Sequence, residues 1–63
     1  MKSLIGQKVE MRLYGGKISE FIVKGEDKNH LIVCTPQNDY DVEKRGERLK
    51  LIGIRREFLI RVV

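Results

Sequence analysis

The residues of this chain best suited to covalent chemistry are its single cysteine, Cys34, and its single histidine, His30. A thiol acts as a nucleophile when a base lies within hydrogen-bond reach of it. His30 and Cys34 fall on one predicted strand, where residues four apart are separated by roughly 13 Å. Cys34 is therefore expected to be a small buried hydrophobe.

The acidic residues offer no firmer catalytic arrangement. Asp39, Asp41 and Glu43 cluster in a segment that is predicted to be a loop without rigid support. The chain has no pair of Cys and His with the spacing of zinc ligands, and Gly15-Gly16 alone indicates a turn rather than a phosphate-binding loop. We therefore expect a protein that is not an enzyme and that uses no metal and no cofactor.

The charge of the chain favours an anionic partner. Thirteen Lys and Arg stand against nine Asp and Glu, which gives a net charge of +4 over 63 residues. Such a basic bias makes RNA or DNA a plausible partner. The simpler interpretation is that each basic residue pairs with an acid or keeps the protein soluble.

The elements that must position these residues are predicted to be short strands. Apolar and charged residues alternate in the first of them, which is typical of a half-buried strand. The five predicted strands span Gln7–Leu13, Ile18–Lys24, His30–Thr35, Leu49–Ile54 and Phe58–Val63.

The connections between the strands are predicted to be mostly tight turns, such as the one at Gly15-Gly16. The polar segment Pro36–Arg48 is predicted to be a loop. A helix around Asp41–Leu49 is the alternative, and Gly46 in its middle argues against it.

This pattern predicts an all-β fold with one domain over residues 1–63. The expected architecture is a small five-stranded, strongly bent antiparallel barrel with at most a short helical turn at Met1–Leu4. A core of this size gives little stability, and one cysteine cannot form an internal disulfide. The last strand, Phe58–Val63, is apolar on both faces and would be a liability in a monomer. We therefore expect oligomerisation.

The compartment is expected to be the cytoplasm, because an unpaired cysteine suits a reducing environment. The N-terminus lacks the apolar stretch of a signal peptide. No run of 18 apolar residues is present, so we expect no association with a membrane.

Two segments resemble the signature motifs of the Sm-like (LSm) RNA-binding family. Leu13–Lys17, followed by Asp27, resembles the first motif, in which a strand ends in Leu, turns at Gly and leads to a loop that opens with Asp. Gly53–Val62 resembles the second motif, in which apolar strands flank an Ile-Arg-Gly-Asp turn. This chain departs from the family at Phe21, where the family has a Gly that bends the second strand, and at the turn Arg55-Arg56-Glu57.

The resemblance implies a protein that assembles as a hexameric or heptameric ring through its last strand and holds single-stranded, for instance U-rich, RNA. It implies that Asp27 orients a loop, and that Asn29 or His30 stacks on one side of a base and Arg55 on the other. The residues that it assigns to RNA binding are Asp27, Asn29, His30, Arg55 and Arg56.

Two points stay open at this stage. Tyr14 and Tyr40 are further candidates for stacking, although Tyr40 could equally anchor its loop. The alternative to an RNA-binding ring is a small SH3-like barrel that serves as a protein-interaction or structural module without nucleic-acid binding. Such a barrel could be a monomer whose final strand pairs with its own first strand.

Overall fold

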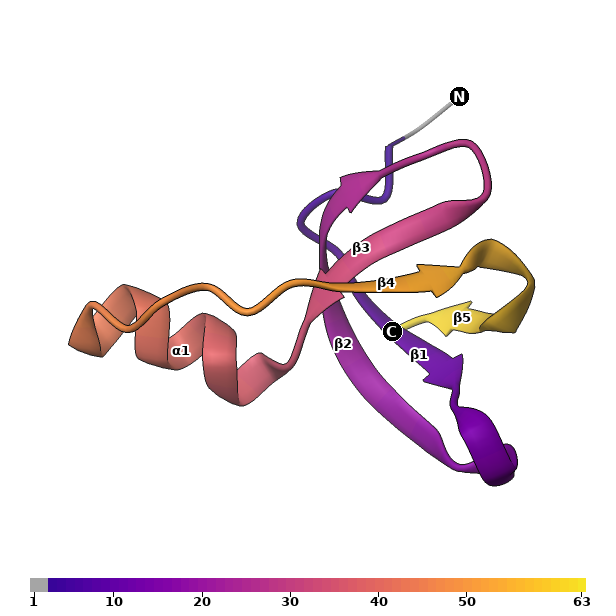
Figure 1. Ribbon diagram of the computed structural model, residues 1–63, viewed down its shortest axis with the longest axis horizontal. Helices are drawn as coiled ribbons and strands as arrows, with labels where there is room; N and C mark the ends of the chain where they lie inside the picture. The colour runs from indigo at the N-terminus through magenta and orange to yellow at the C-terminus, as the bar shows by residue number, and fades with distance from the viewer. Residues whose placement is uncertain (1–2) are drawn as a thin grey trace.

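The computed structural model describes residues 3–63 and shows one antiparallel sheet with one α helix (Figure 1). The β-rich class is therefore as predicted, whereas the helix is not. The elements in chain order are β1 (Lys8–Arg12), a 3-10 turn (Tyr14–Gly16), β2 (Ile18–Glu26), β3 (His30–Cys34), α1 (Pro36–Arg45), β4 (Ile52–Arg55), a second 3-10 turn (Arg56–Phe58) and β5 (Leu59–Val62).

The five strands form a single bent sheet in the order β4-β3-β2-β1-β5. The last strand returns to the first, with Val62 opposite Val9 and Leu59 opposite Met11. This is the pairing expected for the monomeric alternative, and it uses only one edge of β5. Within residues 3–63 the sheet order ends at β4 and β5, so these are its two edge strands.

The core lies on one face of the sheet, because the period-two alternation turns every second side chain inward. Cys34 is also buried, as expected. Phe21, at the position where the Sm-like resemblance implies a Gly, is only 4% exposed and packs in the core. The irregularity of β2 comes later, as a register shift between Val23 and Gly25. The core residues are Val9, Met11, Phe21, Val23, Leu31, Val33 and Ile54.

The prediction of a loop at Pro36–Arg48 is wrong, because α1 occupies Pro36–Arg45. Thr35 caps the start of the helix by accepting a 3.0 Å hydrogen bond from the Asn38 backbone N–H, and proline suits the first helical position. Gly46 ends the helix in the left-handed conformation, with φ of 68°. Gly46 is thus a C-terminal cap and not an interruption.

The fourth strand starts at Ile52 and not at Leu49. Residues 46–51 instead run back along α1 without joining the sheet (Figure 1). The Asn38 side chain joins the two segments: its Nδ2 donates to the Arg48 carbonyl oxygen at 3.1 Å. Its Oδ1 accepts from the Lys50 backbone N–H at 2.8 Å.

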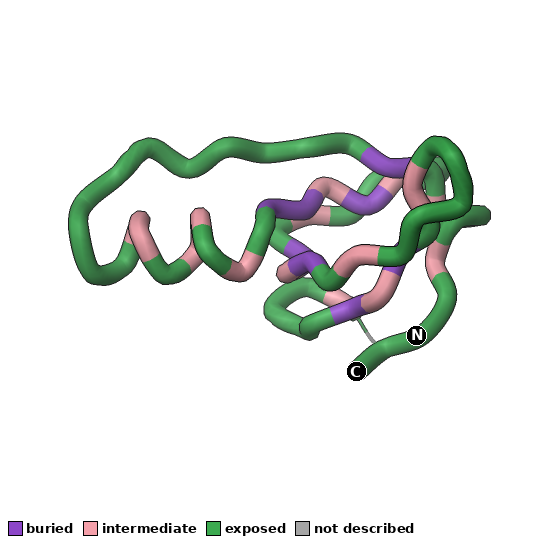
Figure 2. Tube along the Cα trace, turned by 90° about the horizontal axis from the view of Figure 1, so that it is seen from below, coloured by how far each residue is buried: buried purple, intermediate pink, exposed green. Residues whose placement is uncertain are grey.

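We call α1 together with residues 46–51 the arm. No residue of α1 is buried, and the arm projects from the sheet as a largely exposed segment (Figures 1 and 2). An ion pair of 2.5 Å between Lys24 Nζ and Asp39 Oδ1 ties its base to β2.

The helical turn expected at Met1–Leu4 falls partly on Met1 and Lys2, which lie outside the described residues. Ser3 and Leu4 are not helical. Leu4 packs against the core, and its backbone N–H donates to the Glu26 carboxylate. The N-terminal segment is thus fixed to the end of β2.

Candidate nucleic-acid interface

Two turns that are far apart in the sequence meet at one end of the sheet. The turn after β2 (residues 27–29) and the turn after β4 (residues 56–58) are adjacent because β3 and β4 pair. The Arg56 backbone N–H donates to the Asn29 carbonyl oxygen at 2.9 Å. The structure therefore brings the residues suggested by the Sm-like resemblance into one region.

His30 and Arg55 lie directly opposite each other across β3 and β4. Directly opposed residues in an antiparallel pair project on the same face, with Cβ atoms about 5 Å apart. Their neighbours Leu31 and Ile54 are the next opposed pair and point into the core, so His30 and Arg55 are on the outer face. The imidazole of His30 and the guanidinium of Arg55 are thus neighbours on the outer face, and the flat ring of a base could stack on either of them.

Arg55, at the end of β4, and Arg56, which opens the following turn, differ in the contacts that hold their side chains. Arg56 Nε donates to the Asp27 carbonyl oxygen at 2.8 Å, and its guanidinium lies 3.7 Å from a Glu26 carboxylate oxygen. Arg55 is 64% exposed and has only a loose 3.8 Å contact with the Glu57 carboxylate. Arg55 is therefore the arginine available to a ligand, while Arg56 holds the turns together.

Asp27 makes two hydrogen bonds within the turn after β2. Its Oδ1 accepts from the Lys28 backbone N–H at 2.8 Å, and its own N–H donates to the His30 carbonyl oxygen at 2.9 Å. Asn29 is exposed at the tip of this turn. The side chain of Asp27 thus shapes the loop that presents Asn29.

One carboxylate beside the site is held in its ionised form. The Leu4 backbone N–H, the Ser3 hydroxyl and the Arg56 guanidinium all favour the charged state, and together they lower the pKa of Glu26. Glu26 therefore neutralises Arg56, which leaves Arg55 and the exposed Lys28 as the cationic groups free to meet a phosphate.

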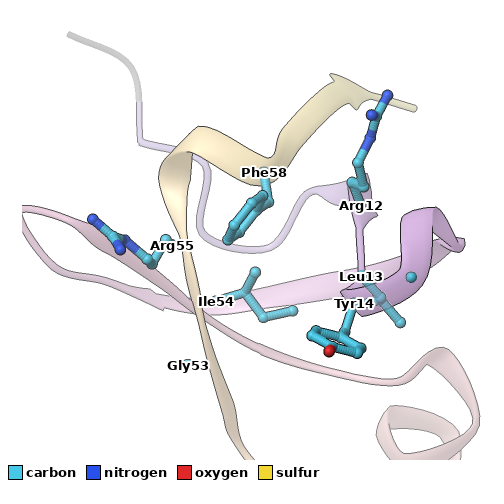
Figure 3. Close-up of a pocket in the computed structure, with 8 residues that line it drawn as sticks. Arg12, Leu13, Tyr14, Gly53, Ile54, Arg55 and Phe58 are labelled. Carbon is cyan, nitrogen blue, oxygen red and sulfur yellow. The ribbon is translucent and has the colours of Figure 1, made fainter.

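A second feature is a hollow of about 440 Å³ between the Tyr14–Gly16 turn and β4 (Figure 3). Its walls are mostly apolar and include two aromatic rings. Sequence reasoning singled out Tyr14 as an exposed aromatic residue but missed the hollow, because no local pattern joins residues 12–15 to 53–58. The lining residues are Arg12, Leu13, Tyr14, Gly15, Gly53, Ile54, Arg55 and Phe58.

Within residues 3–63, no group of three or more His, Cys, Asp and Glu side chains could hold a metal ion. No helix in the same range is long and apolar enough to cross a membrane. Burial raises the pKa of the Cys34 thiol, which keeps it protonated and a poor nucleophile at neutral pH.

No model of a protein family, no curated protein and no solved structure gives a significant match to this chain. Inference about its function therefore starts from the geometry of its own residues.

Proposed function

We propose that this protein is a non-enzymatic, Sm-like RNA-binding protein of the cytoplasm that holds single-stranded RNA where Asn29, His30 and Arg55 lie together. The observation that carries the proposal is the direct opposition of His30 and Arg55 across β3 and β4. Any base can stack on the planar groups of Arg55 and His30, and Asn29 could add a hydrogen bond to the edge of the base. U-rich RNA is the first candidate, on the strength of the Sm-like motifs.

The charge distribution supports an RNA partner. The net charge is +4, and Glu10 and Glu26 are each paired with an arginine, Arg61 and Arg56. Internal pairing of acids leaves other basic groups free for the phosphate backbone. Contacts to phosphates bind sequence-independently and weaken with salt.

Exposed apolar surface supports assembly into a ring. The chain exposes 4877 Å², whereas a compact monomer of its mass is expected to expose roughly 4,200 Å². The projecting arm adds to this surface, and apolar side chains are also exposed at the edge of the sheet. Ile60, Val62 and Val63, in or beside the edge strand β5, are between 42% and 54% exposed. We propose that β5 joins β4 of the next subunit in a ring of six or seven.

The test is fluorescence anisotropy with labelled oligo-U, oligo-A and matched DNA at one fixed salt concentration. Arg55→Ala and His30→Ala should each weaken oligo-U binding by roughly 1–3 kcal/mol. The charge-matched control is Arg61→Ala, because Arg61 lies on β5 and pairs with Glu10 at 2.6 Å. Equal small losses in all three variants would point to non-specific charge attraction, and no binding by an assembled ring would refute the function.

The second candidate is an SH3-like module for protein interaction or structural support. It is favoured by the pairing of β5 with β1 inside one chain, which completes the sheet without a partner. Sedimentation at low and high salt separates the two candidates. A species of about 7.4 kDa at every salt concentration would contradict the ring, since 7.4 kDa is the mass of one chain.

A further inference from the structure

We infer that the hollow between the Tyr14–Gly16 turn and β4 is a second stacking site, which takes another base of the same RNA strand. The inference rests on the proposed function and deepens it: one base would stack beside His30, and a second base of the same strand would occupy the hollow. The hollow's volume of about 440 Å³ falls within the roughly 300–1,000 Å³ of small-ligand sites.

The walls of the hollow suit a flat aromatic ligand. Phe58 and Tyr14 lie on opposite sides of Ile54 (Figure 3). Tyr14 is completely exposed, at 104%, so no residue within the described range 3–63 covers its ring. A ring with free faces beside an apolar floor is a stacking platform that tolerates any base.

The charges around the hollow favour a polyanion over a peptide. Its charged lining residues are Arg12 and Arg55, and no acidic residue is among the described residues that line it. Arg12 makes no ion pair with any described residue. Both guanidinium groups point away from the apolar floor (Figure 3). Both are therefore free to meet phosphates of a strand whose base occupies the hollow.

The hollow and the first site share one residue, Arg55, at the end of β4. Successive residues of a strand point to opposite faces, so Ile54 faces the hollow while Arg55 faces His30. Arg55 is also among the residues that line the hollow. A strand of RNA that stacks one base beside His30 can thus pass the end of β4 and place another base between Tyr14 and Phe58.

The experiment uses the two tyrosines of the chain, which has no tryptophan. Tyr14→Ser removes the proposed platform. Tyr40→Ser is the matched control, because Tyr40 lies on α1 and is not among the residues that line the hollow, which leaves its earlier candidacy for stacking without a site. Octauridine affinity at fixed salt should fall about 5- to 150-fold in Tyr14→Ser and stay unchanged in Tyr40→Ser. Each variant keeps one tyrosine, so octauridine should quench the fluorescence of the Tyr40→Ser protein, which reports on Tyr14, but not that of Tyr14→Ser.

The outcomes separate this inference from the proposed function. Unchanged octauridine binding by Tyr14→Ser, with the expected loss in Arg55→Ala, overturns the second site and leaves the first. Failure of the unmodified ring to bind octauridine overturns both. Equal losses in the two tyrosine variants, or quenching of Tyr14 by a proline-rich peptide and not by octauridine, also overturns the second site.

Discussion

Arg56 Nε donates a 2.8 Å hydrogen bond to the Asp27 carbonyl oxygen, and this bond joins the turn after β4 to the turn after β2. The Arg56 backbone N–H adds a second bond across the same junction, to the Asn29 carbonyl oxygen. Asn29, in the turn after β2, and Arg55, at the end of β4, are thus held in one fixed arrangement. A site that is already ordered loses less conformational freedom when a ligand binds.

Removal of the Arg56 side chain should loosen this junction. We expect Arg56→Ala to lower the free energy of unfolding by about 1 kcal/mol. Arg56→Lys should recover little of the loss, because lysine keeps the charge but lacks the Nε donor. Urea unfolding measures both variants. The control is Arg55→Lys, whose exposed side chain should change stability by less than about 0.5 kcal/mol. An unchanged unfolding midpoint in Arg56→Ala would contradict the structural role of this residue.

The pH dependence of stability should carry the signature of Glu26. Because the folded chain lowers the pKa of Glu26, its carboxylate stabilises the fold above the pKa that it has in the unfolded chain. That contribution is lost as the pH falls through the lower, folded pKa. Glu26→Gln should therefore unfold with a shallower dependence on pH in the acid range. Urea unfolding between pH 3 and 7 measures it, with the exposed Glu47→Gln as control. Identical curves for Glu26→Gln and the unmodified protein would refute the assignment.

The two phenylalanines should differ in their importance for folding. Phe21 is 4% exposed and Phe58 is 39% exposed. Phe21→Ala should cost about 3–5 kcal/mol, and a domain of this length has roughly 3–9 kcal/mol in total. We therefore expect Phe21→Ala to be mostly unfolded by circular dichroism at 37 °C, while Phe58→Ala keeps its fold. A Phe21→Ala protein that melts like the unmodified one would show that the core does not depend on this ring.

The ends of α1 should control the arm without affecting the sheet. Gly46→Ala forces a Cβ into a backbone with φ of 68°, at a cost of about 1–2 kcal/mol. Thr35→Ala removes the N-terminal cap and should cost about 1 kcal/mol. Since α1 buries no residue, these losses should appear as faster amide hydrogen exchange in α1 with unchanged exchange in β1, β2 and β3. Gly46→Asn is the control, because asparagine tolerates this conformation. Equal acceleration in the sheet would show that the arm and the sheet unfold together.

The strands were predictable because their signals are local. Alternation at Val9 and Met11 and the glycines after Tyr14 depend on neighbouring residues alone, and they gave β1 and its turn with small errors at the ends. The helix was also readable: Thr35-Pro36 is a start signal and Gly46 a stop signal. The prediction of a loop over Pro36–Arg48 is wrong because the alternative helix was placed at Asp41–Leu49, where Gly46 falls in the interior and not at the end.

The start of β4 and the second candidate site depend on contacts that a local pattern cannot contain. Leu49 and Leu51 are typical strand residues. The Asn38 side chain, however, hydrogen-bonds to the Arg48 carbonyl oxygen and the Lys50 backbone N–H, which are then not available to a neighbouring strand. The hollow needs Tyr14 and Phe58 to lie on opposite sides of Ile54, and this placement depends on the order of strands in the sheet. That His30 and Arg55 lie near each other was implied by the resemblance to the Sm-like motifs, and hydrophobic periodicity does not indicate it.

The arm also affects the order in which the chain can fold. β3 and β4 are neighbours in the sheet, but the whole arm separates them in the sequence, and closing a long flexible loop costs entropy. A helix forms within about a microsecond, and the Asn38 hydrogen bonds then fold residues 46–51 back along it. Helix formation thus returns the chain to the sheet, so that β4 meets β3 through a short search. The arm contributes almost nothing to the core, yet it can set the rate at which the last two strands dock.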